Sequence, residues 1–227
     1  MTGITDHLAE IRARTGRAAA EAGRRGTDIT LVGVTKGHPV AAVQSSLEAG
    51  LQDFGENYVQ EALPKIAGVN RDAVWHFIGR IQSNKTREIA ENFAWVQTVT
   101  SARIAERLSA QRSHYGAPLQ VCIQLQPGTG GIARTGCPRA EVAALADAIA
   151  GLPRLRLRGV MLLPHAGLDA DGLRVEYRAA RATLDQLNAR GLALDTLSMG
   201  MSDDFELAIA EGSTMIRIGT ALFGRRA

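Results

Sequence analysis

Apolar runs and amphipathic stretches alternate along the 227 residues of the chain. Short runs rich in Val, Ile and Leu, bounded by Gly, Pro or polar residues, are typical of buried strands. This pattern predicts strands at about residues 29–35, 51–55, 74–79, 94–99, 119–125, 155–163, 196–199 and 215–218.

Between these runs, apolar residues recur at intervals of three and four, as on the buried face of a helix. We expect helices over about residues 4–23, 40–49, 56–67, 83–92, 101–114, 139–150, 171–190 and 203–211, and a short helix opening at Gly219. Ser83 and Ser101 are expected to cap two of them through their hydroxyls, and Asp203 and Asp204 to cap the helix after the seventh strand.

Strands that alternate with helices through short connections indicate a parallel sheet with right-handed crossovers. Eight is also the number of strands that closes a TIM barrel. The sequence therefore predicts a single (β/α)8 TIM-barrel domain over residues 1–227, with an additional N-terminal helix. An open doubly wound sheet is the alternative architecture.

Composition narrows the range of partners. The 26 Lys and Arg exceed the 23 Asp and Glu by only three, they form no long basic run, and aromatic residues make up 4% of the chain, so no nucleic-acid surface is expected. Cys122 and Cys137 lack metal-ligand spacing, so we expect no metal and a reducing compartment. No segment resembles a signal peptide or reaches membrane-spanning length. A cytoplasmic monomer or weak dimer without membrane contact is the expectation.

Lys36 is the first candidate functional residue, because it directly follows the first predicted strand. The carboxyl ends of barrel strands form the active-site face. A lysine amine that is withdrawn from water has a lowered pKa and attacks carbonyl groups. The alternative is a lysine whose stem lies on the strand end while its ammonium stays in water.

A candidate phosphate site follows the last strands. In a closed barrel, strand eight lies beside strand one, and the loops after strands seven and eight often bind phosphate. Gly219 and Thr220 open a short helix whose first amides can bind an anion, and the Ser198 hydroxyl can add a hydrogen bond. A tight turn at Gly219 and a cap at Ser198 are the alternatives.

A reactive lysine beside a phosphate site suits pyridoxal 5′-phosphate (PLP), which carries both an aldehyde and a phosphate. Sugar phosphates that are processed by Schiff-base aldolases suit the same two features. The residues by themselves leave both ligands open.

Several longer motifs carry a family resemblance. They are Val34-Thr35-Lys36, residues 54–61 (FGENYVQE), 75–79 (WHFIG), 81–85 (IQSNK), 197–204 (LSMGMSDD) and 217–224 (RIGTALFG). Over nearly its whole length the chain resembles the YggS/PROSC-type pyridoxal-phosphate homeostasis proteins. It departs from them at Arg134, where a loop lysine is frequent, and at Arg80, where Pro or His is common.

The resemblance implies a fold-type III barrel, similar to the N-terminal barrel of alanine racemase, with PLP held as an aldimine on Lys36. It also places Arg217 at the pyridine nitrogen; an ion pair of Arg217 with a barrel acid such as Glu56 is the alternative. The other cofactor-binding candidates are Asn57, His76, Ser198, Met199, Gly219 and Thr220. An Asx turn at Asn57 and core packing of His76 are the alternatives for these two.

The function implied is PLP binding in intracellular vitamin B6 homeostasis, by buffering the cofactor or delivering it to apoenzymes, without catalytic residues or efficient turnover. Two reasons argue against turnover. The related racemases add a β-rich domain after the barrel, whereas this sequence ends at Ala227. Arginine also stays protonated, so the ring nitrogen beside it stays unprotonated and withdraws electrons less well. A PLP-dependent racemase or decarboxylase is the main alternative, and an aldolase is a remote one.

Overall fold

The computed structural model describes residues 3–69, 72–128 and 135–224. Arg134 lies outside these residues. The strands are β1 (Thr30–Val34), β2 (Asp53–Glu56), β3 (Val74–Phe77), β4 (Trp95–Val99), β5 (Leu119–Leu125), β6 (Leu155–Leu162), β7 (Thr196–Ser198) and β8 (Met215–Ile218). They are parallel and form a closed barrel in chain order, with Thr30 of β1 paired to Met215 of β8. The predicted TIM barrel is confirmed, and the open sheet is excluded.

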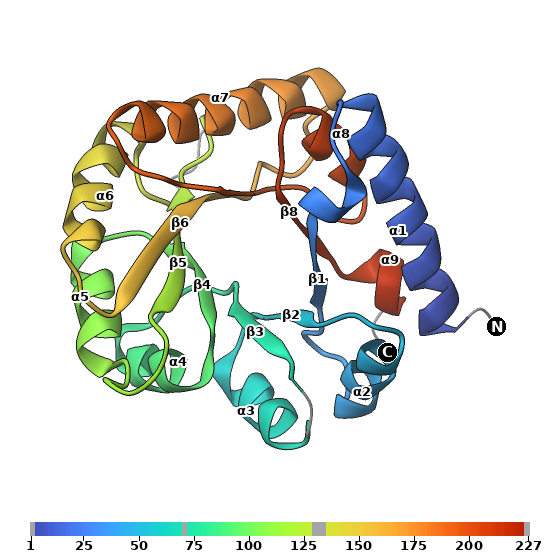
Figure 1. The fold of residues 1–227 in the computed structure, drawn as a ribbon, viewed down its shortest axis with the longest axis horizontal. Helices are drawn as coiled ribbons and strands as arrows, with labels where there is room; N and C mark the ends of the chain where they lie inside the picture. The colour runs from blue at the N-terminus through green and yellow to red at the C-terminus, as the bar shows by residue number, and fades with distance from the viewer. Residues whose placement is uncertain (1–2, 70–71, 129–134, 225–227) are drawn as a thin grey trace.

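Helices surround the ring of strands (Figure 1). They are α1 (Ile4–Glu21), α2 (Val40–Glu48), α3 (Val59–Ala67), α4 (Thr86–Asn92), α5 (Ala102–Gln111), α6 (Val142–Ala150), α7 (Ala170–Ala189), α8 (Phe205–Ala210) and α9 (Thr220–Phe223). The N-terminal helix α1 packs against α8 and α9, and the His7 ring contacts the Leu222 carbonyl oxygen at 3.0 Å. No helix among the described residues has both the length and the apolar character to cross a membrane.

Some expected helix starts are wrong by a few residues. The helix expected from Glu56 begins at Val59, because Glu56 is still part of β2. Ser83 opens a 3-10 turn (Ser83–Lys85), so α4 begins only at Thr86. The Ser101 hydroxyl makes no cap hydrogen bond to α5. Glu56 and Ser83 are polar residues of the kind that often begins a helix, but here Glu56 ends a strand and Ser83 begins a tight turn.

The aspartates before α8 also differ from expectation. Asp204 occupies the N-cap position, but its carboxylate accepts a hydrogen bond from the Met201 amide at 2.6 Å rather than from the helix. Asp203 lies on the loop between β7 and α8. Asp204 therefore stabilises this loop rather than the helix end.

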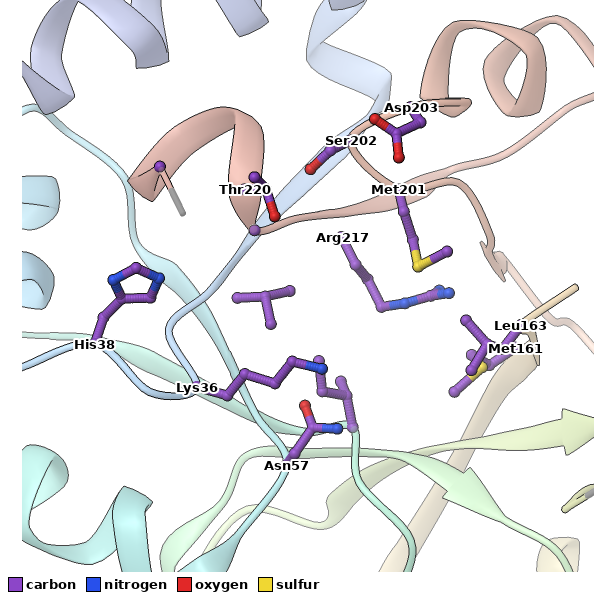
Figure 2. A pocket seen from close by; sticks show the side chains of 14 residues that line it. Lys36, His38, Asn57, Met161, Leu163, Met201, Ser202, Asp203, Arg217 and Thr220 are labelled. Carbon is purple, nitrogen blue, oxygen red and sulfur yellow. The ribbon is translucent and has the colours of Figure 1, made fainter. Parts of the chain in front are cut away.

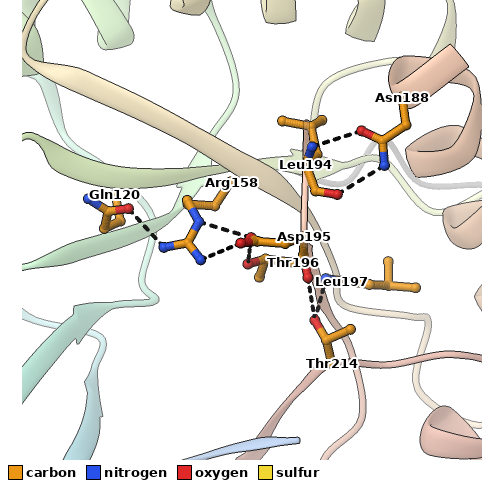
Figure 3. A network of polar contacts seen from close by, with 8 residues as sticks. All are labelled: Gln120, Arg158, Asn188, Leu194, Asp195, Thr196, Leu197 and Thr214. Atoms are coloured by element: carbon orange, nitrogen blue, oxygen red, sulfur yellow. Dashed lines mark hydrogen bonds and ion pairs between the residues drawn. The ribbon is translucent and has the colours of Figure 1, made fainter. Parts of the chain in front are cut away.

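A polar network holds the amino ends of several strands together (Figure 3). The Arg158 guanidinium donates to both Asp195 carboxylate oxygens, at 2.9 and 2.6 Å, and to Gln120 Oε1 at 2.9 Å. Thr214 Oγ1 accepts from the Leu197 amide at 2.8 Å and donates to the Asp195 carbonyl oxygen at 3.2 Å. These contacts join β5, β6, β7 and the approach to β8, and leave the opposite end of the barrel for a binding site.

Both cysteines are buried. Cys122 lies within β5, and Cys137 lies in the segment between β5 and α6. The Cys137 amide donates to the Gln124 carbonyl oxygen at 2.7 Å, so the loop after β5 returns along that strand and buries the thiol. Burial raises the pKa of Cys137 to about 11, which makes it a poor nucleophile.

Candidate functional site

A cavity of about 240 Å³ opens at the carboxyl ends of the strands. Five of the predicted site residues line it: Lys36, Asn57, Arg217, Gly219 and Thr220. The rest of its wall is formed by Val34, His38, Ile78, Met161, Leu163, Met201, Ser202, Asp203 and Gly224. In Figure 2, Lys36 and Asn57 lie on one side of the cavity, Thr220 and Ser202 on the other, and Arg217 between them.

Lys36 lies two residues beyond the end of β1, and its half-buried side chain extends into the cavity (Figure 2). The turn after it is held by the His38 amide, which donates to the Thr35 carbonyl oxygen at 3.0 Å, and by the Gly37 amide, which donates to Glu61 Oε2 at 3.0 Å. Side chains alternate along an extended segment, so Val34 and Lys36 share the cavity side while Thr35 faces the surrounding helices.

A buried ion pair supports Lys36 from behind. Lys65 on α3 donates to Glu56 Oε1 at 2.6 Å and to the Thr35 carbonyl oxygen at 2.7 Å, and the Thr35 hydroxyl donates to the same carboxylate oxygen at 2.6 Å. Burial raises the pKa of Glu56, against the opposing hydrogen bonds from Lys65 and Thr35. Glu56 thus pairs with Lys65, and the alternative pairing with Arg217 is wrong.

Asn57 is placed by a close approach of two backbones. A Cβ at Gly79 would lie 2.0 Å from the Asn57 carbonyl oxygen, so only glycine fits after β3. The Asn57 Oδ1 atom is buried and has no hydrogen-bond partner among the described residues. Buried polar atoms are nearly always paired, so an unpaired amide oxygen at a cavity indicates a ligand that donates to it.

The opposite wall is formed by the loop after β7 and the start of α9. Gly200 has a φ of 95°, and a Cβ there would lie 2.6 Å from that of Ala208, so glycine is required for this loop. Ser202 Oγ accepts a hydrogen bond from the Ala221 amide at 3.3 Å, which leaves the hydroxyl proton available to a ligand. At Gly219 a Cβ would meet Val34 no closer than 3.6 Å, so this position is open.

Arg217 brings a buried cation to the cavity. Its Nη1 donates to Ser198 Oγ at 2.7 Å and its Nη2 to the Leu162 carbonyl oxygen at 3.0 Å. A guanidinium has five N–H bonds, so others remain for a ligand. Burial lowers the pKa of Arg217. Arg217 and Gly219 both line the cavity, as expected for residues on one face of β8.

Three predicted site residues lie elsewhere. His76, Ser198 and Met199 are fully buried and do not line the cavity. Ser198 Oγ donates to Gln97 Oε1 at 2.7 Å, so its hydroxyl points into the barrel rather than toward a phosphate. The physical reason is that side chains within strands fill the barrel interior, while residues beyond the strand ends form its mouth.

The same reasoning identifies what the sequence analysis missed. Ser202 belongs to the same motif as Ser198 but lies four residues past the end of β7, in the loop that forms the wall. His38, Met161 and Met201 also line the cavity. The family departure at Arg80 is exposed and does not line it. The predicted seventh strand ended at Met199, whereas β7 ends at Ser198. With Ser198 placed inside the strand, Ser202 in the following loop would have been the better candidate for the phosphate contact.

Comparison with known proteins first identifies the class. Residues 7–227 match the family described as alanine racemase, N-terminal domain. An alanine racemase from Bacillus anthracis superposes with a TM-score of 0.69 at 21% identity, covering 96% of this chain and 56% of the racemase. This likeness shows the fold, so the barrel is of the alanine racemase N-terminal type.

More similar relatives narrow the class. The pyridoxal phosphate homeostasis protein of Pseudomonas aeruginosa is 48% identical over 100% of this chain and 97% of its own length. That of Escherichia coli is 44% identical over 100% and 98%. PipY of Synechococcus elongatus, solved with PLP bound, superposes with a TM-score of 0.86 at 36% identity, over 97% of this chain and 100% of PipY. The chain belongs to the family of pyridoxal phosphate homeostasis proteins.

Proposed function

We propose that this protein binds PLP in the cavity at the barrel mouth, as a Schiff base with Lys36, and serves in vitamin B6 homeostasis in the cytoplasm. The observation that carries the proposal is the convergence on one cavity of the Lys36 amine, the open wall at Gly219 and Ser202, and the buried Asn57 Oδ1, which no described residue hydrogen-bonds. The names of the relatives and the PLP bound to PipY support it.

The residues present fit the chemistry of PLP. The cofactor supplies an aldehyde, and Lys36 supplies the amine that condenses with it. The Ser202 hydroxyl and the backbone of Gly219 and Thr220 would hold the phosphate, so Ser202 takes the part expected of Ser198. Arg217 would donate to the ring nitrogen, which has an acceptor lone pair.

Other wall residues suit the rest of the ligand. Val34, Ile78 and Met161 would offer apolar surface to a flat ring. Asn57 Oδ1 would accept a hydrogen bond from a polar group on the ring edge. Lys36 and the phosphate wall lie on opposite sides of the cavity, as a ligand that carries an aldehyde and a phosphate at separate positions requires (Figure 2).

The role in homeostasis is to sequester PLP and release it, either to the solution or to PLP-dependent apoenzymes. Both roles need a reversible Schiff base and neither needs turnover. The rival function, an amino-acid racemase or decarboxylase, would use the same lysine. The fold likeness to alanine racemase favours it, and an assay of the PLP-loaded protein for turnover of amino acids separates the two.

The experiment reduces the PLP-loaded protein with borohydride and locates the pyridoxyl group by peptide mass spectrometry. We expect one main adduct, on Lys36, and its loss in Lys36→Ala. Lys85→Ala is the matched control, because Lys85 does not line the cavity and forms an ion pair with Glu88. A main adduct on Lys65 or Lys85, with Lys36 unmodified, would refute the proposal, and a colourless protein that binds a sugar phosphate would favour an aldolase.

A further inference from the structure

A continuous line of hydrogen bonds runs through the barrel interior beneath the cavity. Arg217 Nη1 lies 2.7 Å from Ser198 Oγ, which lies 2.7 Å from Gln97 Oε1. Gln97 Nε2 lies 3.0 Å from His76 Nδ1, and His76 Nε2 lies 2.9 Å from Asp53 Oδ1. We call this the interior chain. It links β8, β7, β4, β3 and β2.

The chemistry at the two ends fixes the direction of every bond. Arginine has only donors, so Ser198 Oγ must accept a hydrogen bond from it and donate its own hydroxyl hydrogen bond to Gln97 Oε1. The Gln97 amide nitrogen can then only donate, which makes His76 Nδ1 an acceptor. The remaining proton of a neutral His76 is on Nε2 and is donated to the Asp53 carboxylate. Burial lowers the pKa of His76, against the effect of Asp53, which favours this neutral form.

The interior chain connects two charges that do not touch. No carboxylate among the described residues forms an ion pair with Arg217, although the residue is only 4% exposed. Asp204 acts on Arg217 through space, but its carboxylate is engaged by the Met201 amide. Asp53 lies at the opposite end, in the first position of β2, with 27% of its side chain exposed. Hydrogen bonds aligned between a cation and an anion strengthen one another in a low dielectric.

We infer that Gln97 and His76 are positioning residues of the cofactor site, which together with Ser198 and Asp53 hold the Arg217 guanidinium so that its remaining N–H bonds face the ring nitrogen of PLP. The inference rests on the proposed function. Apart from Arg217, no member of the interior chain lines the cavity, so these residues act only through Arg217. His76 stacks on Trp95, with ring centroids 5.3 Å apart, and this contact holds the imidazole in the orientation that its two hydrogen bonds require.

Gln97→Leu tests the inference, because leucine can neither accept from Ser198 nor donate to His76. Thr98→Val is the matched control: Thr98 is the next residue on β4, is also buried, and loses one hydrogen bond, from its hydroxyl to the Gly79 carbonyl oxygen at 2.7 Å. Gln97→Glu is the rescue variant for the Arg217 end, because its carboxylate can accept from Ser198 and brings a negative charge closer to Arg217. It cannot donate to His76 Nδ1, so His76 must carry a proton on Nδ1 to bond with it.

The first measurement is the ¹⁵N chemical shift of PLP labelled at the ring nitrogen and bound to each variant. We expect Gln97→Leu to move the shift toward that of a pyridine without a hydrogen bond and to weaken PLP binding roughly tenfold. Thr98→Val and Gln97→Glu should keep the wild-type shift. An unchanged shift in Gln97→Leu with PLP on Lys36, or an equal change in Thr98→Val, would overturn the inference while leaving the proposed function intact.

The second measurement needs no cofactor. In the unloaded protein, the guanidinium protons of Arg217 should exchange with water more slowly in the wild type than in Gln97→Leu, and equal rates would count against the interior chain. If Gln97→Leu does not fold, Asp53→Asn replaces it in both measurements. It keeps the shape and the acceptor for His76 but removes the negative charge, and we expect smaller changes in the same direction. No change in either measurement would overturn the inference.

Discussion

The ammonium group of Lys65 lies 2.6 Å from Glu56 Oε1, directly behind the strand end that carries Lys36. The Lys65 side chain is only 8% exposed and that of Glu56 is fully buried. The second carboxylate oxygen, Oε2, has no hydrogen-bond partner within the described part of the chain. Because Lys65 also binds the Thr35 carbonyl oxygen, this pair fixes the peptide that leads into Lys36.

Lys65→Met should lower the free energy of unfolding by about 3–5 kcal/mol, because it leaves the buried Glu56 carboxylate without its cation. Arg87→Met is the control, since Arg87 forms an exposed pair with Glu91 on α4 and should cost less than about 1 kcal/mol. Chemical denaturation of the cofactor-free proteins measures both. Equal losses in the two variants would contradict a supporting role for the Glu56–Lys65 pair.

Gly219→Leu should weaken PLP binding strongly, because a large side chain would block the wall at which the phosphate is expected. The unloaded fold should tolerate Gly219→Ala, since a Cβ there meets Val34 only at 3.6 Å. Titration of visible absorbance measures PLP affinity, and thermal unfolding checks the fold. Gly200→Ala provides the contrast, because its positive φ and the nearby Ala208 should destabilise the protein itself. Wild-type affinity in Gly219→Leu would exclude this wall as the phosphate site.

Ser202→Ala should weaken PLP binding by about 1 kcal/mol, the value of one neutral hydrogen bond among several. Ser198→Ala is a different change, because it removes the acceptor of Arg217 Nη1 and should alter the environment of the ring nitrogen rather than that of the phosphate. Phosphorus NMR of bound PLP should therefore respond to Ser202→Ala and stay unchanged in Ser198→Ala. A response to Ser198→Ala and none to Ser202→Ala would instead indicate that Ser198 contacts the phosphate.

The loaded protein should show little or no turnover of L-alanine, L-lysine or L-ornithine. Arg217 keeps its proton, so a ring nitrogen that accepts a hydrogen bond from it would stay unprotonated and would stabilise a carbanion poorly. Resolving the enantiomers and amines after incubation checks this. Repeated turnover at about 1 s⁻¹ or faster, abolished by Lys36→Ala, would establish the rival function of racemase or decarboxylase.

Acid should weaken the network at the amino end of the barrel. Burial raises the pKa of Asp195, but the hydrogen bonds from Arg158 and Thr196 outweigh this effect and the net pKa is lowered below 3.8. A carboxylate with a lowered pKa stabilises the fold fully above its unfolded value, and this contribution is lost as pH falls through the folded value. Unfolding followed from pH 7 to about pH 3 should show a smaller loss in Asp195→Asn than in the wild type. Parallel curves would contradict this role for Asp195.

Much of the barrel could be predicted from the chain alone, because strands buried on both faces consist of continuous apolar runs, and each run is separated from the next by a helical pattern. Lys36, Gly219 and Thr220 follow directly after such runs, so their position at the mouth was predictable. The errors occur at Glu56 and Ser83, where the residue type is compatible with either the end of one element or the start of the next. Backbone hydrogen bonds decide these cases, and local pattern does not report them.

By itself, the sequence determined the barrel, the family and the strand ends that carry the candidate cofactor site, since these depend on periodicity and on motifs that are continuous in the chain. Only the tertiary structure decided that Glu56 pairs with Lys65, that Ser202 rather than Ser198 faces the cavity, and that His76 is buried in the barrel interior. The physical reason is that closing the barrel packs strand interiors in layers. Whether a polar side chain meets a ligand or another strand depends on its layer, and therefore on neighbours far away in the sequence.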